Sequence, residues 1–317
     1  MPGKKKFFRY IFVQLLLLSF AAGLAQEATA LADCIKLNDT WKITKALKSN
    51  GGINKADPEG DTPLMLAALY GNAETMRWML KKGADPNGKN SEDETALMWA
   101  IHDLEKIKIL LGHGADINAR TKSGNTALLL AAVGSSQFET VSFLLQNGAD
   151  PLVKNKRNET PLIRAAIFGD TATLGLLIRN GNDVNAIDSN GFTPLLQTLF
   201  NVNREGTIYL LENGADPEKV VAFGLTAIIA VVTYNDLPSV QAVLKATKNI
   251  NAVDEGGMNA LMWAVYNEHD NTAIIKALLD RGVDVHLKDK KGMTALDWAR
   301  KKGNTKTLAM LLQAGAQ

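Results

Sequence analysis

The sequence is poor in the residue types that mark disulfide-bonded, metal-binding or catalytic proteins. Its 317 residues include one cysteine and four histidines. A single cysteine excludes an internal disulfide, and the histidines stand at unrelated spacings that fit no His/Cys metal site. A Gly-x-Ser-x-Gly elbow and a phosphate-binding glycine loop are also missing. We therefore expect no metal, no cofactor and no enzymatic activity. The histidines are His102, His113, His269 and His286.

Long hydrophobic runs are also scarce, and the one candidate lies at the start of the chain. Basic residues at 4–9 precede an apolar run over 10–22, and small residues follow at 23–25. This order is that of a secretory signal peptide and predicts cleavage after residue 25. A retained membrane anchor is an alternative, although the run is shorter than the roughly 20 residues of a membrane span. A lipoprotein is a further alternative, but the only cysteine, Cys34, lies well beyond the run.

Neither charge sign predominates. The chain has 35 Lys and Arg against 33 Asp and Glu, and four of the basic residues fall within the predicted signal peptide. The remaining chain is nearly neutral and has no basic run. Because phosphate contacts need clustered Lys and Arg, we do not expect nucleic acid as a partner.

A repeat of 31–35 residues runs through the rest of the chain. Its first mark is a tripeptide of Thr, then Pro or Ala, then Leu or Ile, and Gly-Ala-Asp recurs in phase as a second mark. Self-similarity at such a period is the signature of a stacked repeat architecture. The first mark begins at Thr62, Thr95, Thr126, Thr160, Thr193, Thr226, Asn259 (as Asn-Ala-Leu) and Thr294.

The residues of one repeat predict two short helices. Thr62 is suited to cap a helix and Pro63 to occupy its first turn. We expect Gly71 to end this helix in a left-handed conformation. The next residues, AETMRWMLKK, place their apolar side chains on one helical face, and Gly83 ends that second helix.

Two marks held in phase over eight copies identify the chain as similar to the ankyrin repeat. The resemblance implies pairs of antiparallel helices, each pair followed by a projecting loop, or finger. We predict an all-α solenoid of about eight full units plus a degenerate N-terminal helix pair at 28–54. The predicted organisation is a signal peptide at 1–25 and an ankyrin-repeat domain at 26–317, with units starting near 57, 90, 121, 155, 188, 221, 254 and 289.

The resemblance also implies a binding surface formed by the fingers and the exposed ends of the first helices, because stacked repeats create an extended concave face. Aromatic residues concentrate at these places, which favours recognition of a protein partner. The alternative is that they seal gaps between neighbouring helices. The predicted partner-binding residues are Tyr70, Phe168, Phe192, Phe200, Val221, Phe223, Leu225, Tyr234, Met258 and Tyr266. Four residues at equivalent places in first helices are expected to stack between helices or to form a ligand cage: Trp99, Arg164, Trp263 and Trp298.

The finger KVVAFGL, residues 219–225, is apolar where other fingers are polar, as in AIDSNGF. We expect an exposed apolar knob with Phe223 in solvent. Two alternatives are a finger collapsed into the core, and valines paired between fingers with only Phe223 pointing outward.

These observations predict an exported bacterial protein, periplasmic or secreted, that acts as a monomer and binds another protein. One alternative is an antidote that covers an exported toxin or enzyme. Another is a membrane-tethered scaffold, if the N-terminal segment is retained. A third is an enzyme whose active site on the concave face carries no recognisable motif.

Overall fold

The computed structural model describes residues 30–49, 51–233, 236–267 and 272–317. The predicted signal peptide and Tyr234 lie outside these ranges, so both remain predictions. Within them the chain forms eighteen α-helices and one short 3-10 helix. The helices are α2 (Ala30–Lys36), α3 (Thr40–Ser49), α4 (Pro63–Tyr70), α5 (Ala73–Lys81), α6 (Ala96–Trp99), α7 (Leu104–Gly112), α8 (Ala127–Ala131), α9 (Phe138–Gln146), α10 (Pro161–Phe168), α11 (Thr171–Arg179), α12 (Pro194–Phe200), α13 (Arg204–Glu212), η1 (Ala222–Gly224), α14 (Ala227–Val231), α15 (Leu237–Ala246), α16 (Ala260–Tyr266), α17 (Thr272–Asp280), α18 (Ala295–Lys302) and α19 (Thr305–Gln313).

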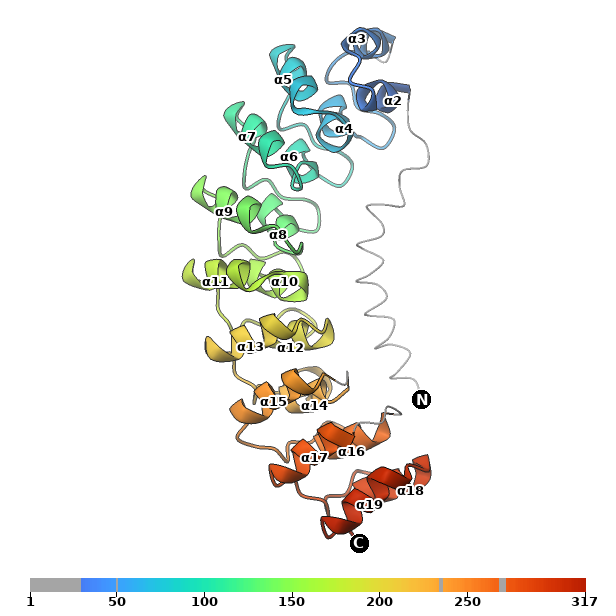
Figure 1. The fold of residues 1–317 in the computed structure, drawn as a ribbon. Helices are drawn as coiled ribbons and strands as arrows, with labels where there is room; N and C mark the ends of the chain where they lie inside the picture. The colour runs from blue at the N-terminus through green and yellow to red at the C-terminus, as the bar shows by residue number, and fades with distance from the viewer. Residues whose placement is uncertain (1–29, 50, 234–235, 268–271) are drawn as a thin grey trace. The chain divides into compact units, whose positions relative to one another are not determined.

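The helices follow one another in pairs and divide into two compact units. The first unit holds residues up to 100 together with 105–116, and the second holds 101–104 and 117–317. In the second unit the first helices of successive pairs, α8 to α18, form one layer, and the second helices, α9 to α19, form the other (Figure 1). An N-terminal pair, α2 and α3, precedes eight further pairs, which confirms the predicted all-α repeat fold.

The repeated tripeptide starts the first helix of each pair as expected. Thr62 Oγ1 accepts a hydrogen bond from Met65 N at 3.3 Å, and Pro63 occupies the first turn. The second helix ends at Gly83, whose φ of +89° is left-handed. Gly71 differs from its prediction, because its φ of −81° is not left-handed. A side chain there would instead meet the carbonyl oxygen of Ala67 at 2.9 Å, so close approach is what favours glycine.

The core lies between successive pairs. The residue that follows the tripeptide is apolar in seven repeats and at most 4 % exposed in each, so it packs between neighbouring helices. These residues are Met65, Met98, Leu129, Ile163, Leu196, Ile229 and Met262. Cys34 is half-buried in α2. Within the described ranges, the helices are all too short or too polar to cross a bilayer.

Candidate protein-binding surface: the fingers

Each finger is a five-residue turn with the same backbone pattern in all eight copies. The amide of position 1 donates to the carbonyl of position 5, and the amide of position 4 donates to the carbonyl of position 1; in the seventh finger Asp254 N lies 3.0 Å from Met258 O. The common pattern makes equivalent positions comparable between repeats. The fingers comprise residues 57–61, 90–94, 121–125, 155–159, 188–192, 221–225, 254–258 and 289–293.

Seven fingers carry a side-chain cap at position 1. There an Asp, Asn or Thr oxygen accepts hydrogen bonds from the finger's own backbone, as Asp254 Oδ1 does from Gly256 N and Met258 N, both at 2.8 Å. Satisfying turn amides in this way is typical of Asp and Asn. We call this arrangement the finger cap. The residues that provide it are Asp57, Asn90, Thr121, Asn155, Asp188, Asp254 and Asp289.

A second hydrogen bond joins some fingers to the first helix of the same repeat. Trp263 Nε1 donates to the other carboxylate oxygen of Asp254 at 2.8 Å. The same bond, also between residues nine apart in sequence, links Trp298 to Asp289 at 3.1 Å. The finger is therefore fixed both by its cap and by the helix behind it.

Trp99 and Arg164, at the same helix position as Trp263 and Trp298, also form a hydrogen bond to a finger. Trp99 Nε1 donates to Glu94 Oε2 at 3.0 Å, and Arg164 Nη1 donates to Glu159 Oε2 at 3.2 Å. Burial lowers the pKa of Arg164, and the charge of Glu159 opposes that shift. These side chains hold fingers in place by polar contacts that neither predicted role included.

The finger at 221–225 has neither feature. Position 1 is Val221, which has no side-chain acceptor, and Ala230 stands at the helix position that holds tryptophan in the next repeat. Phe223 has a φ of +66° and Gly224 one of +74°, whereas in the other seven fingers only position 4 has a positive φ. A bulky residue in the left-handed region is strained.

The apolar side chains of this finger are only partly packed. Phe223 is 61 % exposed and Val220 is 65 % exposed, while Val221 and Leu225 are half-buried. The prediction that Phe223 reaches solvent is confirmed, and the collapsed finger is excluded. Val220 also points outward, so the valines are not both paired between fingers.

Phe192 contradicts its prediction as an exposed finger tip. It is 5 % exposed and its ring packs edge-on against that of Phe200 at 5.3 Å between centroids. Phe192 occupies position 5, the inward end of the finger next to the first helix, whereas Phe223 occupies position 3. Met258 also lies at position 5 and is half-buried.

The aromatic residues at the ends of the first helices are mostly packed. Phe168 is 38 % exposed. Phe200 is half-buried, and so is Tyr266, whose ring packs edge-on against Trp263 and Trp298. Tyr70, also half-buried, has the Lys36 ammonium 4.7 Å from its ring centre. For Phe200 and Tyr266 the structure fits the alternative that aromatics seal gaps between helices.

Sequence reasoning treated Val220 only as part of its own finger and missed the row to which it belongs: in the second unit, the residue directly before position 1 is exposed in all six fingers. In the second unit three successive members of this finger-base row are apolar: Ile187 (42 % exposed), Val220 and Val253 (46 % exposed). Aligning the repeats at that one position would have revealed the row. Its six members in this unit are Arg120, Lys154, Ile187, Val220, Val253 and Lys288, all exposed.

Comparison with known families fits this architecture. The family model described as "Ankyrin repeats (3 copies)" matches residues 9–90, 31–121, 85–155, 128–221, 201–289 and 226–317. The chain belongs to the ankyrin-repeat family. Ankyrin repeats act in protein–protein interaction and are typically not catalytic.

Several proteins with ankyrin-type segments are similar to parts of the chain. Human (Homo sapiens) M-phase phosphoprotein 8 is 38 % identical over 90 residues, 28 % of this chain and 10 % of that protein. The mouse (Mus musculus) DNA-binding protein RFXANK is 46 % identical over 54 residues, 17 % of this chain and 20 % of that protein. Human transient receptor potential cation channel subfamily A member 1 is 26 % identical over 119 residues, 37 % of this chain and 11 % of that protein. The chain thus spans at most a fifth of the length of these relatives.

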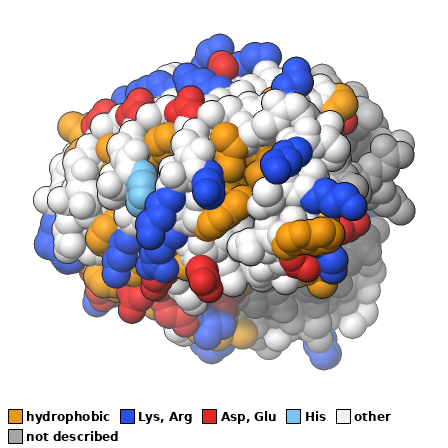
Figure 2. All heavy atoms as spheres, turned by 90° about the horizontal axis from the view of Figure 1, so that it is seen from above, with side chains coloured by type: hydrophobic (Ala, Val, Ile, Leu, Met, Phe, Trp, Pro, Cys, Tyr) orange, Lys and Arg blue, Asp and Glu red, His pale blue; other side chains and the backbone are white. Residues whose placement is uncertain are grey.

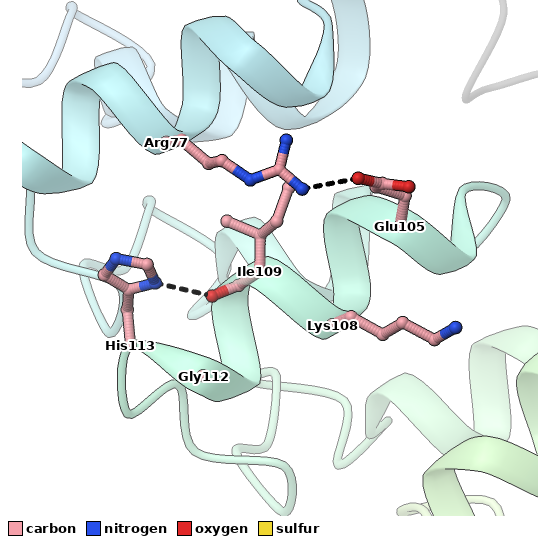
Figure 3. Close-up of a pocket in the computed structure, with 6 residues that line it drawn as sticks. All are labelled: Arg77, Glu105, Lys108, Ile109, Gly112 and His113. Carbon is pink, nitrogen blue, oxygen red and sulfur yellow. Dashed lines mark hydrogen bonds and ion pairs between the residues drawn. The ribbon is translucent and has the colours of Figure 1, made fainter.

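The first compact unit has a pocket between two second helices, α5 and α7, and its lining does not resemble a metal or catalytic site. It encloses about 320 Å³. Arg77 of α5 forms an ion pair across it with Glu105 of α7, and His113 Nδ1 lies 2.8 Å from the carbonyl oxygen of Ile109 (Figure 3). The described residues contain no group of three or more His, Cys, Asp or Glu able to hold a metal ion.

Charge on the ankyrin surface is mixed. Figure 2 shows one face of the molecule, on which basic and acidic side chains lie near one another and hydrophobic side chains form separate small groups. Both charge signs on one face suit contacts with protein better than contacts with a polyanion.

Proposed function

We propose that this ankyrin-repeat protein binds another protein through the fingers of its second unit, with the finger 221–225 at the centre. The observation that carries the proposal is Phe223, a large aromatic side chain 61 % exposed at the tip of a finger without a cap. Aromatic anchors of this kind supply much of the affinity of protein interfaces. Exposed Val220 beside it enlarges the apolar area.

The composition of the other fingers supports the same centre. Position 3 is polar, charged or glycine in the remaining seven copies. Only here is the residue a large apolar one, and only here does position 3 have a positive φ, which disfavours a bulky side chain. A turn selected for stability alone would carry glycine or asparagine at such a backbone position. Recognition by Phe223 accounts for both its exposure and its strain.

Export of the protein is a further part of this proposal. It rests on the order of basic, apolar and small residues within the first 25 positions. The intact mass of the protein purified from its native host should correspond to a chain that starts at or near Gln26. Recovery of the full chain in the membrane fraction would contradict export with cleavage and favour a tethered scaffold.

Site-specific photo-crosslinking in the native host tests the binding role. A benzoylphenylalanine at position 223 replaces one aromatic side chain by another and should capture a defined protein on illumination. The same group at Phe138, 37 % exposed at the start of α9, is the matched control and should not capture it. Adding Val220→Asp should abolish capture at 223. Equal capture at both positions, or none at 223, would contradict the proposal.

A further inference from the structure

The exposed finger residues of the second unit follow a pattern along the six fingers. In each finger the residue before position 1 and those at positions 2 and 3 mark its outer edge. In the three middle fingers these nine places include Ile187, Val220, Phe223 and Val253, and the single charge there is that of Glu255. The flanking fingers are basic and exposed at Arg120, Lys122, Lys154 and Lys156 on one side and at Lys288, Lys290 and Lys291 on the other.

The pattern lies along one edge in space as well as in sequence. Backbone hydrogen bonds join neighbouring fingers, from Lys156 N to Ser123 O at 2.9 Å and from Glu255 N to Phe223 O at 3.1 Å. Equivalent bonds link the fingers at 157 and 189 (2.7 Å) and at 256 and 290 (2.9 Å). Between the fifth and sixth fingers, a Cβ built on Gly191 would lie 3.2 Å from Ala222 N. The six fingers therefore abut in one register.

An open groove marks the boundary between the basic and apolar parts of this edge. It encloses about 580 Å³, and Lys154 and Ile187 both line it. Lys219 also lines it, with its ammonium held by the carbonyl oxygen of Asn185 at 2.6 Å. A partner that crosses this boundary meets fixed positive charge beside exposed aliphatic side chains.

We propose that this six-finger edge binds a segment of the partner protein that is apolar at its centre and acidic at both ends. The inference rests on the proposed function and specifies the partner's chemistry. Opposite charge at the two basic ends would steer and orient the segment, and the apolar centre would bury against Val220, Phe223 and Val253. The chain's own basic start, at residues 4–9, has the wrong charge sign for the basic ends.

The same pattern disfavours nucleic acid. A polyanion needs cations along its whole length, whereas the three middle fingers offer apolar groups and Glu255. The spacing also sets a length for the segment. Stacked helices lie about 8–10 Å apart, so the two basic ends, separated by four repeats, are about 40 Å apart. An extended segment spans that distance in about 12 residues.

Selection from a display library of random 20-residue peptides on the immobilised full chain tests the inference. Enriched peptides should carry Asp or Glu on both sides of an apolar centre, and a 20-nucleotide single-stranded DNA should not compete with them. Enrichment of basic or uncharged peptides, competition by the DNA at equal concentration, or no enrichment would each overturn the proposal.

A charge-reversal variant tests whether the basic ends of the edge bind the acidic residues of the peptide. Lys154→Glu, Lys156→Glu and Lys290→Glu together, all at exposed places, should weaken the best acidic peptide about tenfold or more in fluorescence anisotropy. A peptide with its acidic residues replaced by Lys should then bind the variant better than the original chain. Lys245→Glu, exposed near the end of α15, is the control and should change the affinity less than twofold. A triple variant that behaves like this control would overturn the proposal.

The two tests fail separately. If position 223 captures a protein in the host but the selection yields no acidic-apolar peptide, the binding function stands and the stated chemistry of the partner is wrong. If acidic-apolar peptides bind but position 223 captures nothing, the chemistry of the edge is right and the finger 221–225 is not the centre of a protein interface in the host. If both fail, the fingers are not the binding surface.

Discussion

Two neighbouring fingers of this protein share one backbone pattern and use it differently. In the finger 254–258 the Asp254 carboxylate caps two turn amides and accepts from Trp263. In the finger 221–225 valine and alanine stand at the places of that aspartate and that tryptophan, and Phe223 projects into solvent. The backbone bonds of the repeat are therefore sufficient to form a finger, and the side-chain cap is an added source of stability that one repeat lacks.

The comparison also separates two uses of apolar residues. Position 5 points inward: Phe192 packs there against Phe200 of α12, and Met258 is half-buried. Position 3 and the residue before position 1 point outward, where Phe223 and Val220 are exposed. Apolar residues at the first place contribute to folding, and those at the second place are available for recognition.

The finger 188–192 is intermediate between the two. Asp188 Oδ1 caps the amides of Asn190 and Phe192 at 2.8 and 2.9 Å. Its other oxygen is buried, and within the described part of the chain that atom has no hydrogen-bond partner. The place of the tryptophan is taken by Gln197. This finger therefore has the finger cap but lacks the hydrogen bond from a tryptophan of the first helix.

The largest effect is expected when the capped finger is converted to the uncapped type. Asp254→Val combined with Trp263→Ala removes three hydrogen bonds and the packing of the indole ring against Tyr266. We expect a loss of about 3 kcal/mol in the free energy of unfolding, measured by urea titration. Val221→Ala is the control and should lose less than about 1 kcal/mol, because it removes no hydrogen bond. A loss below that of the control would mean that the cap contributes nothing to stability.

How far the sequence predicts the structure follows from the same positions. The helix pairs were predictable because the caps, helix breaks and apolar positions recur with the repeat. The opposite exposures of Phe192 and Phe223 were not, since the composition of a finger does not show which of its residues point outward. Their positions in the turn distinguish them, and an alignment of the eight turns at position 1 gives those positions. The bond between Asp254 and Trp263 was predictable only in part: its nine-residue spacing recurs at Asp289, but a single sequence does not show that the side chains meet.

A smaller effect on the free energy of unfolding, dependent on pH, is expected from a substitution in the finger 188–192. Burial raises the pKa of Asp188 above its ordinary value of 3.8, because the carboxylate is desolvated and Glu159 is a nearby like charge. Asp188→Asn keeps the oxygen that caps the turn and replaces the carboxylate oxygen without a partner by an amide nitrogen, which is a donor. Asn155 has the same arrangement in the preceding finger, where its amide nitrogen donates to Glu159. We expect the variant to be more stable by about 2 kcal/mol at neutral pH.

The sign of the pH dependence follows from the raised pKa. The folded protein holds the proton of Asp188 more tightly than the unfolded chain, so the ionised group destabilises the fold fully above its folded pKa. The advantage of the variant should therefore shrink as pH falls and vanish below about 3.8, in urea titrations at several pH values. Asp183→Asn, at an exposed carboxylate of the preceding repeat, is the control for the substitution itself. An advantage independent of pH would contradict the assignment to ionisation.

The smallest effect concerns the backbone of the uncapped finger. Phe223 has a φ of +66°, a region that glycine enters freely and that costs other residues about 1 kcal/mol. Phe223→Gly should therefore be about 1 kcal/mol more stable than Phe223→Ala, since both remove the same ring and differ only in the Cβ. At Asn190, the same position of the finger 188–192 with no positive φ, the order should reverse, and alanine should be more stable than glycine by about 0.5 kcal/mol. Thermal unfolding of the four variants measures both differences.

If alanine and glycine at position 223 give equal stability, the backbone there is not strained in solution, and the two fingers differ only in their side-chain caps. If the predicted order holds, the protein maintains a strained turn that displays an aromatic side chain, which is expected of a residue kept for binding and not for stability.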